Sequence, residues 1–437
     1  MSAGFATTTI EDATERLIDY RGKTPPKTDT GVRLVTAKVI KGGQILHDRR
    51  EFISADFYDQ WMRRGLPEQY DVLITTEAPL GEVAVLRTTE KIALAQRVIL
   101  LRADKAKTDP LFLFYALQSE FAQGELKARG TGTTVLGIKQ SELRQVRIPI
   151  FSLPVQIRIA GILSAYDELI ENNQRRIRIL EDMARSLYRE WFVHFRYPGH
   201  EAVPLVDSPL GPIPHGWEIR ALDQLITNHI GGGWGKEVDD EKHTEAAWVI
   251  RGTDIPEARN NQTDKVPHRF HTPSNLRTRR LQVGDIIFEV SGGSKGQPVG
   301  RTLLVSHGLI STLDGGDVIC ASFCKRVCPD VDGYGSELLY LSFLEGYEDG
   351  EIEQFQVQST GISNFKWTEY LQQVRRVVPP ESLRTRFKVT ASSLFDQIAI
   401  LGKQRSNLRN TRDLLLPKLL SGDVNFKAVN VEGDEYV

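Results

Sequence analysis

Residues 154–195 read PVQIRIAGILSAYDELIENNQRRIRILEDMARSLYREWFVHF, and one stripe of this stretch decides the architecture of the chain. From Ile159 to Trp191 the stripe advances in alternating steps of four and three residues, and no proline or glycine falls between Gly161 and Trp191. These steps predict a helix with a heptad seam along one face. At 1.5 Å per residue the helix would be about 60 Å long, and it needs a partner to bury the seam. The first seam comprises Ile159, Leu163, Tyr166, Ile170, Asn173, Ile177, Leu180, Ala184, Leu187 and Trp191.

A second stretch repeats the same steps and predicts that the partner helix lies in the same chain. The differences 387 − 159 and 419 − 191 both equal 228, so the two seams match over their whole length without a gap. An offset of 229 would instead match Tyr166-Asp167 with Phe395-Asp396, and two ordinary long core helices are the simpler alternative. The second seam comprises Phe387, Ala391, Leu394, Ile398, Leu401, Arg405, Leu408, Arg412, Leu415 and Leu419.

The bulk properties limit the class of protein. A chain of 437 residues with 40% hydrophobic residues can form two or three domains with their own cores. A formal charge of −2 excludes a generally basic protein, so any contact with nucleic acid must use localised basic groups or a partner. The sequence has no apolar run long enough to span a membrane and no secretory signal. Three cysteines fit a reducing cytoplasm, which is the expected location.

Each of two mixed α/β units is followed by one of the long helices. A proline-rich linker separates the first unit and its helix from the second unit and its helix. In the first unit we expect a helix at 10–18, strands at 32–35, 71–76, 83–86 and 97–101, and a helix at 109–121. In the second unit we expect helices at 221–228 and 337–344 and strands at 248–251, 285–290, 302–305 and 318–327. The predicted divisions are 1–150 and 217–378 for the units, 151–197 and 379–425 for the helices, 198–216 for the linker and 426–437 for an acidic tail. The chain is therefore predicted to be an α+β protein with a pseudo-twofold internal duplication.

A search for catalytic motifs finds none with the required spacing. There is no G-x-x-x-x-G-K-[ST] loop, no G-x-G-x-x-G after a strand and no G-x-S-x-G turn. Cys320, Cys324 and Cys328 stand four residues apart, and we interpret them as a reduced strand face rather than a zinc site. We therefore predict no catalytic, cofactor-binding or metal-binding residues in this chain.

The favoured chemistry is contact with a polyanion. Basic and polar side chains gather around turn-rich and Gly/Thr-rich loops, where guanidinium and amide groups can read base edges and hydroxyls and lysines can hold phosphates. A solvated charged surface is the simpler interpretation of each residue alone. The candidates are Arg21, Lys23, Thr24, Lys27, Arg129, Thr131, Thr133, Lys139, Trp234, Lys236, Arg251, Lys295, Arg301, Gln358, Thr360, Asn364 and Lys366.

The layout resembles the specificity subunit of type I restriction–modification enzymes over nearly the whole chain. The resemblance is strongest in the two long helices, in the linker and in the turn-rich stretch near the N-terminus. One departure is that the glycine-rich opening of the second unit, 231–235, lacks the usual Thr-Pro. The matching segments are 153–156 with 162–167, 414–422, 211–217 and 21–25.

The resemblance implies a fold and a function. Each α/β unit would be a target recognition domain that reads one half of a bipartite, asymmetric DNA site. The two long helices would form an antiparallel coiled coil that separates the domains. Two adenine methyltransferase subunits and two motor–nuclease subunits would assemble on this chain, which itself catalyses nothing. S-adenosylmethionine, ATP and Mg would belong to those partners.

Two other functions remain open from the residues. One is a stand-alone DNA-modifying enzyme, either a nuclease or a fused methyltransferase, which predicts turnover by the isolated chain. The other is a coiled-coil scaffold with no role in nucleic-acid binding, which predicts no shift of a DNA duplex in a gel.

Overall fold

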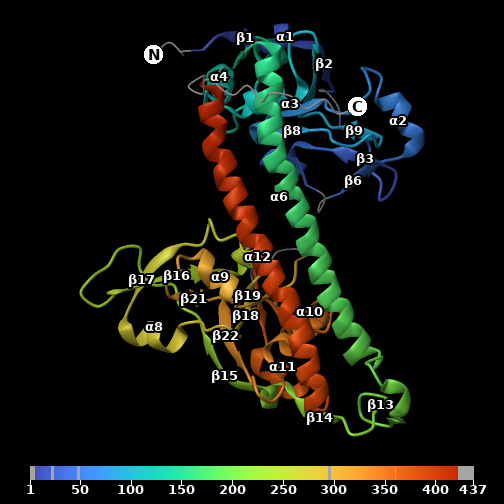
Figure 1. Ribbon diagram of the computed structural model, residues 1–437, viewed down its shortest axis with the longest axis vertical. Helices are drawn as coiled ribbons and strands as arrows, with labels where there is room; N and C mark the ends of the chain where they lie inside the picture. The colour runs from blue at the N-terminus through green and yellow to red at the C-terminus, as the bar shows by residue number, and fades with distance from the viewer. Residues whose placement is uncertain (1–4, 21–23, 47–49, 294–296, 360, 422–437) are drawn as a thin grey trace, which may run out of the picture. The chain divides into compact units, whose positions relative to one another are not determined.

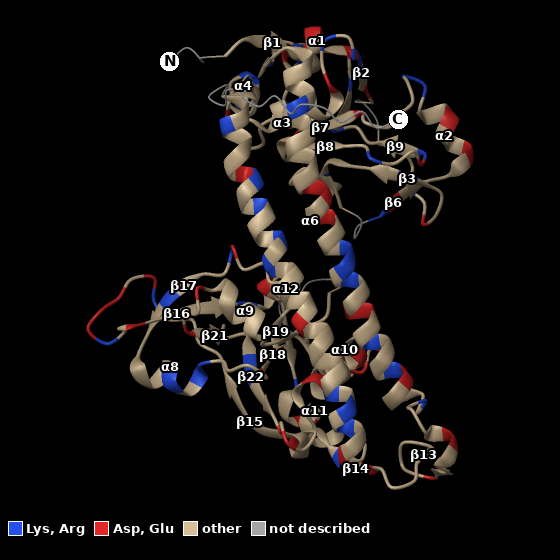
Figure 2. Ribbon diagram, viewed as in Figure 1, with Lys and Arg blue, Asp and Glu red and all other residues tan. Residues whose placement is uncertain are grey.

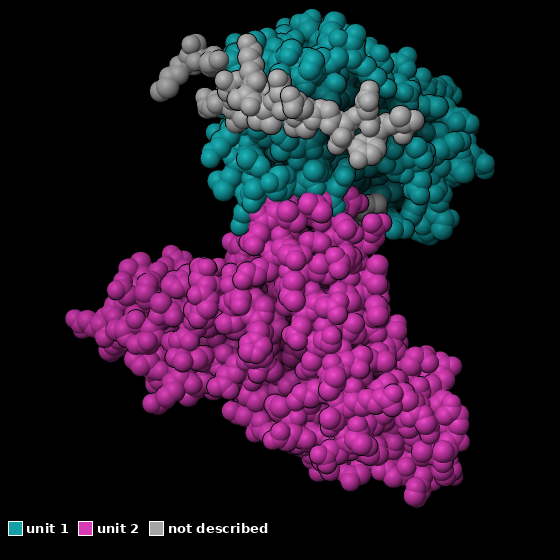
Figure 3. All heavy atoms as spheres, in the orientation of Figure 1, with its two compact units in different colours: residues 1–168, 409–437 teal, residues 169–408 magenta. Residues whose placement is uncertain are grey.

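A computed structural model describes residues 5–20, 24–46, 50–293, 297–359 and 361–421. The chain divides into two compact units (Figure 3): unit 1 contains residues 1–168 and 409–437, and unit 2 contains residues 169–408. The division falls inside both long helices, so each unit holds a segment of each helix. Among the described residues, no helix is both long and apolar enough to cross a bilayer.

Unit 1 is built on a four-stranded antiparallel sheet with the order β2-β10-β7-β8. A second sheet has the order β6-β3-β9, with β3 and β9 parallel. Helix α3 packs on β8 and β10, and Asp109 caps its N-terminus by accepting a hydrogen bond from the backbone N–H of Phe112, as predicted (Figure 1). The elements are β1 (Thr7–Thr9), α1 (Ile10–Ala13), β2 (Thr14–Asp19), β3 (Val32–Val35), β4 (Ile40–Lys41), β5 (Gln44–Ile45), β6 (Glu51–Ile53), α2 (Ala55–Trp61), β7 (Val72–Thr76), β8 (Leu80–Val85), β9 (Ile92–Leu94), β10 (Val98–Ala103), α3 (Pro110–Gln118), α4 (Glu120–Arg129), α5 (Gln140–Arg144) and β11 (Arg147–Pro149).

Unit 2 repeats this plan. Its four-stranded antiparallel sheet has the order β15-β22-β18-β20, and its second sheet, β17-β16-β21, again contains one parallel pair. The elements are β12 (Leu205–Val206), β13 (Ile213–Pro214), β14 (Glu218–Ala221), β15 (Ile226–Gly231), β16 (Glu245–Ile250), α7 (Ile255–Ala258), β17 (His268–His271), α8 (Pro273–Arg279), β18 (Ile286–Glu289), β19 (Ser291–Gly292), β20 (Thr302–Leu304), α9 (His307–Thr312), β21 (Val318–Cys320), β22 (Cys324–Pro329), α10 (Ser336–Glu348), β23 (Gln356–Ser359), β24 (Ile362–Phe365), α11 (Trp367–Gln373) and β25 (Arg375–Val378). The matching strand orders confirm the predicted duplication.

The same buried turn leads into β7 in unit 1 and into β18 in unit 2, an inner strand of each four-stranded sheet. In unit 1, Asp71 Oδ2 accepts a hydrogen bond from the backbone N–H of Glu68 at 2.6 Å. In unit 2, Asp285 Oδ2 accepts the equivalent bond from Gln282, also at 2.6 Å. Each carboxylate then binds an arginine of the neighbouring strand, which supplies the positive charge that a buried carboxylate needs.

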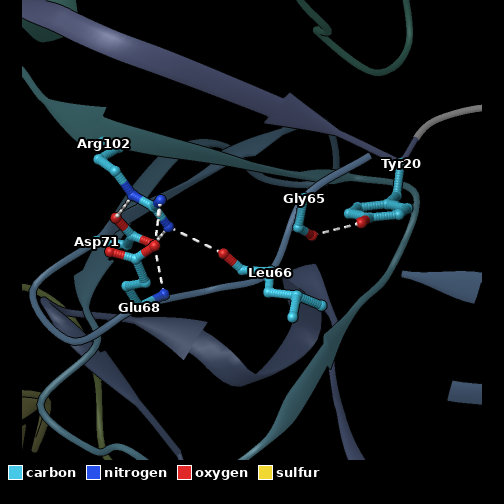
Figure 4. A network of polar contacts seen from close by, with 6 residues as sticks. All are labelled: Tyr20, Gly65, Leu66, Glu68, Asp71 and Arg102. Atoms are coloured by element: carbon cyan, nitrogen blue, oxygen red, sulfur yellow. Dashed lines mark hydrogen bonds and ion pairs between the residues drawn. The ribbon is translucent and has the colours of Figure 1, made fainter. Parts of the chain in front are cut away.

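The arginine of unit 1 organises a wider network (Figure 4). Arg102 donates to both carboxylate oxygens of Asp71, at 2.9 and 2.8 Å, to Glu68 at 2.5 Å and to the carbonyl oxygen of Leu66 at 2.9 Å. The hydrogen bond to Asp71 raises the pKa of Arg102. This arginine therefore ties the turn before β7 to β10, and it is fully engaged inside the domain.

The long helices α6 (Leu153–Tyr188) and α12 (Glu381–Leu420) pair in an antiparallel manner in unit 2. Trp191 lies in a π-type turn, Arg189–Val193, that continues α6, and its ring is 5.8 Å from that of Phe387. Earlier on α6, Ile177 packs with Ile398 and Leu401. Residue numbers thus rise along one helix as they fall along the other, which confirms the expected coiled coil.

The helix segments of unit 1 pair with the same polarity. Ile159 and Leu163 share a core cluster with Leu419 and Leu420. One turn further along α6, Asp167 accepts hydrogen bonds from Arg412 of α12 and from the hydroxyl of Tyr115, both at 2.6 Å. Every seam residue of the two helices is buried or half-buried. Arg405, expected on the second seam, is only 2% exposed and donates to the backbone oxygen of Asn260 at 2.9 Å.

Two predicted helices are wrong. The segment 10–18 forms only the short helix α1 before strand β2 begins, and 221–228 forms a 3-10 turn, Leu222–Leu225, followed by β15. In both segments the chain pairs with a central strand, β10 or β22, and sheet pairing overrides the weak helical pattern.

Other boundaries also move. The predicted helix 109–121 is broken at Ser119, whose hydroxyl caps α4 by accepting from Ala122 N–H. The predicted strand 318–327 is two strands, β21 and β22, separated by the turn 321–323. The loop predicted at 358–366 is the hairpin of β23 and β24. The break at 321–323 also removes the single strand face predicted for Cys320, Cys324 and Cys328, all of which are free thiols.

Candidate nucleic-acid interface

The first candidate surface lies where β7 of unit 1 ends. The backbone N–H of Thr76 donates to the carbonyl of Arg97 at 3.0 Å, and Ile138 N–H donates to the carbonyl of Thr76 at 3.0 Å. The loop 130–137 is closed by two hydrogen bonds between Thr131 and Gly137, at 2.7 and 2.9 Å. Three segments that are far apart in the sequence therefore meet at one corner of the domain.

This corner forms a cleft with a polar lining. Two of the predicted contacts, Thr131 and Lys139, lie in it and are exposed. Gln96 and Arg97 line the same cleft, and Arg97 forms an ion pair with Glu77 at 3.5 Å. The cleft presents donors, acceptors and positive charge together, which are the groups that read base edges and hold phosphates.

Unit 2 has an equivalent corner at the end of β18. The N–H groups of Val290 and Ser291 both donate to the carbonyl of Phe323, at 2.9 and 3.2 Å, and Phe365 N–H donates to the carbonyl of Val290 at 2.9 Å. The hairpin of β23 and β24 stands where loop 130–137 stands in unit 1. Its Asn364 pairs with Ser291, whose hydroxyl donates to the amide oxygen of Asn364 at 2.8 Å.

Of the other predicted contacts in unit 1, two are held in ion pairs. Lys27 binds Glu51 at 2.8 Å, and Arg129 binds Glu142 at 3.2 Å. Thr24 and Thr133 are exposed, the latter on loop 130–137. Arg21 and Lys23 lie outside the described residues, as do Lys295 and Thr360 of the second unit.

Two predicted contacts in unit 2 bind buried carboxylates of the same unit. Arg251 binds Asp254 through two hydrogen bonds, at 2.8 and 2.7 Å, and Arg301 binds the buried Glu289, at 2.8 and 2.5 Å. In both cases the hydrogen bond to the carboxylate raises the pKa of the arginine. The structure therefore gives these two arginines internal partners, and their role as DNA contacts stays a prediction without geometric support.

The remaining candidates of unit 2 are exposed. Gln358 and Asn364 lie on the hairpin at the corner, and Lys366, at its base, binds Glu369 at 3.0 Å. Trp234 lies on a separate loop, with the guanidinium of Arg269 4.9 Å from its ring centre. Lys236 on that loop binds Asp240 at 2.6 Å. Basic residues gather on the neighbouring helix α8 (Figure 2).

Sequence reasoning missed three residues at the corners, namely the half-buried Gln96 and the exposed Arg97 and Phe323. The sequence predicts Arg97 as the first residue of the strand 97–101, so its side chain would be assigned to a sheet. Phe323 was hidden inside one long predicted strand. The local feature that both turns share is an alanine followed by an uncharged polar residue, Ala95-Gln96 in unit 1 and Ala321-Ser322 in unit 2.

The described residues contain no group of three or more His, Cys, Asp or Glu side chains arranged to hold a metal ion. Burial raises the pKa of Cys320 to about 12 and that of Cys328 to about 11, so these thiols stay protonated at neutral pH.

Comparison with known proteins gives one consistent match. Residues 21–182 match the family model described as "Type I restriction modification DNA specificity domain". The chain is 24% identical over 361 residues to the type I restriction enzyme MjaIX specificity subunit of Methanocaldococcus jannaschii, covering 81% of this chain and 77% of that protein. It is 29% identical over 152 residues to the putative MjaX specificity subunit of the same organism, covering 34% and 35% of the two chains.

A solved structure has the same fold. The crystal structure of the type I restriction–modification system S subunit from M. genitalium superposes with a TM-score of 0.57 and 16% identity, covering 96% of both chains. At this identity the likeness concerns the arrangement of helices and strands alone.

Proposed function

This chain belongs to the specificity subunits of type I restriction–modification systems, whose function is DNA sequence recognition, and from that premise we propose how it divides the task. Unit 1 reads one half of a bipartite DNA site and unit 2 reads the other half. The two half-sites differ in sequence, so the complete site is asymmetric. The bases that separate them are not read.

The observation that carries this proposal is that one architecture occurs twice with different side chains at the same place. Both central sheets end in a corner built from the same set of backbone hydrogen bonds. Both corners carry a lysine at the same place, Lys139 and Lys366, but the first corner adds Arg97 and Thr131 whereas the second adds Phe323 and Asn364. Two surfaces that match in backbone and differ in chemistry are suited to two unlike sequences.

We also propose that the antiparallel helix pair sets the spacing of the half-sites. A paired helix seam is stiff over its length, whereas the linker 198–216 contains five prolines and no long helix. The exposed faces of α6 and α12 would serve as the frame for two adenine methyltransferase subunits and two motor–nuclease subunits. This chain would supply recognition only, with S-adenosylmethionine, ATP and Mg bound by those partners.

Methylation profiling tests the division of labour. The chain would be produced together with its methyltransferase partner, and methylated adenines would be mapped across a genome. We expect two short half-sites of different sequence separated by a spacer of fixed length. A continuous short motif, or methylation without sequence preference, would contradict the proposal. Turnover of DNA by the isolated chain would instead support a stand-alone enzyme.

A heptad insertion tests the spacer. Seven residues would be inserted into α6 between Glu168 and Leu169, and seven into α12 between Leu408 and Arg409, where the two compact units divide. A heptad keeps the seam in phase and adds about 10 Å of helix, which corresponds to roughly three base pairs of B-DNA. We expect the spacer to lengthen while both half-sites stay unchanged. The matched control is an insertion of five residues in each helix, which puts the seam out of phase. An unchanged spacer in the heptad variant would contradict the proposal that the helix pair sets the spacing of the half-sites.

A further inference from the structure

Arg97 and Phe323 hold the same position in a turn that is repeated in the two units. In unit 1 the turn begins at Ala95, whose carbonyl accepts from the N–H of Val98 at 3.2 Å. In unit 2 it begins at Ala321, whose carbonyl accepts from the N–H of Cys324 at 2.8 Å. Arg97 and Phe323 are each the third residue of their turn, immediately before β10 and β22 respectively.

The surroundings of the two turns match as well. The N–H of the first turn residue donates to the strand of the second sheet, from Ala95 to Val35 at 3.0 Å and from Ala321 to Ile250 at 2.8 Å. The carbonyl of the third turn residue accepts a hydrogen bond from the neighbouring strand. Arg97 accepts from the N–H of Thr76 at the end of β7, and Phe323 accepts from the N–H of Val290 just after β18. These repeated bonds fix the two backbones alike, so the two side chains leave the fold from equivalent points.

Both side chains are exposed, and neither is needed for the core. The side chain of Arg97 is 47% exposed, and its ion pair with Glu77 is 3.5 Å long and itself exposed. Phe323 is 54% exposed. Exposed ion pairs contribute little to stability, so the guanidinium is available to another ligand. A single exposed apolar residue is ordinary on a protein surface. Phe323 is assigned a role because it holds the position in the turn of unit 2 that Arg97 holds in the turn of unit 1.

The chemistry of the two side chains differs in a way that maps onto bases. An arginine guanidinium donates two hydrogen bonds to O6 and N7 of guanine, and a carboxylate accepts from N4 of cytosine. Arg97 and Glu77 together therefore suit a G·C pair. A phenyl ring makes no hydrogen bond, but it contacts the C5-methyl group of thymine.

We propose that this turn position is a specificity determinant of both domains, with Arg97 selecting a guanine in the half-site of unit 1 and Phe323 selecting a thymine in the half-site of unit 2. The inference rests on the proposed function, because it assumes that each unit reads one half-site. It adds the residue that reads and the base that it reads.

The test uses the complex of the full chain with its methyltransferase subunit. Arg97→Ala and Phe323→Ala would each be compared with the unaltered chain by methylation mapping and by competition binding to duplexes with single base-pair changes. For Arg97→Ala we expect discrimination at one guanine of the first half-site to fall by about tenfold or more. For Phe323→Ala we expect about a fourfold loss at one thymine of the second half-site, the value of one buried methyl group. In each variant the other half-site should be unchanged.

Matched controls separate recognition from general damage. Arg147→Ala removes an exposed arginine of unit 1 on β11, and Val283→Ala removes an exposed apolar side chain at the opposite end of β18 from Phe323. Neither control should alter either half-site. Phe323→Arg provides a gain-of-function variant, for which we expect guanine to replace thymine at the affected position.

The outcomes distinguish the inference from the proposed function. If the unaltered complex has no bipartite motif, the proposed function fails. If the motif is bipartite but Arg97→Ala and Phe323→Ala leave it intact, the inference fails while the proposed function stands. A variant that changes both half-sites equally would also overturn the inference, since the assignment is one residue to one half-site.

Discussion

The turn that leads into β7 in unit 1 and β18 in unit 2 is the same, but each unit stabilises it by different means. In unit 1 the residue before the aspartate is Tyr70, with a φ of 71°, and in unit 2 it is Gly284, with a φ of 94°. Only glycine adopts this conformation without steric cost. Unit 1 compensates with a denser arginine network, because Arg102 donates two hydrogen bonds to Asp71, whereas Arg326 donates one to Asp285, at 2.7 Å. The backbone frame is shared, and the side chains that hold it are free to differ.

Removing the buried carboxylate should give the largest effect and should separate the two units. Asp71→Ala leaves Arg102, whose side chain is 10% exposed, without its main partner in a buried site. We expect a loss of about 3–5 kcal/mol in the free energy of unfolding, as for other broken buried pairs. Asp285→Ala should cost less, because it removes fewer hydrogen bonds. Amide hydrogen exchange, followed separately in β7 and β18, measures each unit. Equal losses in both units would show that the denser network adds nothing.

Asp167 and Glu181, two of the acidic residues of α6, provide a second comparison, with effects of opposite sign. In unit 1, Asp167 binds Arg412 and Tyr115, so Asp167→Asn should lower the unfolding free energy by about 1.5–3 kcal/mol, the usual value of hydrogen bonds to a charged group. In unit 2, burial raises the pKa of Glu181, against the opposing influence of Arg185. Glu181→Gln should therefore stabilise unit 2 at neutral pH.

The sign of the Glu181 effect fixes its pH dependence. A carboxyl group whose pKa is raised by folding favours the folded state when it is protonated. Its contribution is present below the pKa of the unfolded chain, about 4.3, and is lost as the pH rises through the folded value. The unaltered chain and Glu181→Gln should thus be equally stable near pH 4 and diverge toward pH 8. Chemical unfolding at several pH values checks this, and a constant difference would refute burial as the cause.

The smallest expected effect comes from giving unit 1 the glycine that unit 2 has at the positive-φ position of the turn. Tyr70→Gly places glycine at a positive φ, and the Tyr70 side chain is 44% exposed, so little packing is lost. We expect a gain of up to about 1 kcal/mol in the unfolding free energy of unit 1. The reverse change, Gly284→Ala, should destabilise unit 2, since a Cβ there would lie 3.1 Å from Ser336 Oγ. Thermal unfolding measures both, and a destabilised Tyr70→Gly variant would indicate that the tyrosine ring packs more than its exposure suggests.

The helix pair and the duplication could be predicted from the sequence because both depend on local periodicity. The spacing of residues such as Ile159, Leu163 and Ile177 is enough to show which face of the helix is buried. The repeated steps from Phe387 to Leu419 identify the partner helix. The antiparallel direction did not come from spacing. It came from the family resemblance and is borne out by the pairing of Trp191 with Phe387.

The reading corners could not be predicted, because they depend on contacts between distant segments. Backbone hydrogen bonds bring together Thr76, Arg97 and Ile138, and no local sequence pattern predicts these bonds. Basic residues were weighted by charge, yet Arg301 is engaged by the buried Glu289, a partner twelve residues away on an antiparallel strand. Phe323 was overlooked because an apolar residue among strand residues is ordinarily assigned to a core.

The discontinuous make-up of unit 1 has a consequence for the order in which the protein is completed during synthesis. Unit 2 is a single run of residues, 169–408, whereas unit 1 also needs residues from 409 onward. The ribosome therefore makes all of unit 2 before it makes Leu419 and Leu420, which share a core cluster with Ile159 and Leu163. Until then the first domain carries an aliphatic stripe open to water. The nascent chain is expected to be most vulnerable to aggregation, and most attractive to chaperones, until these residues have emerged and packed.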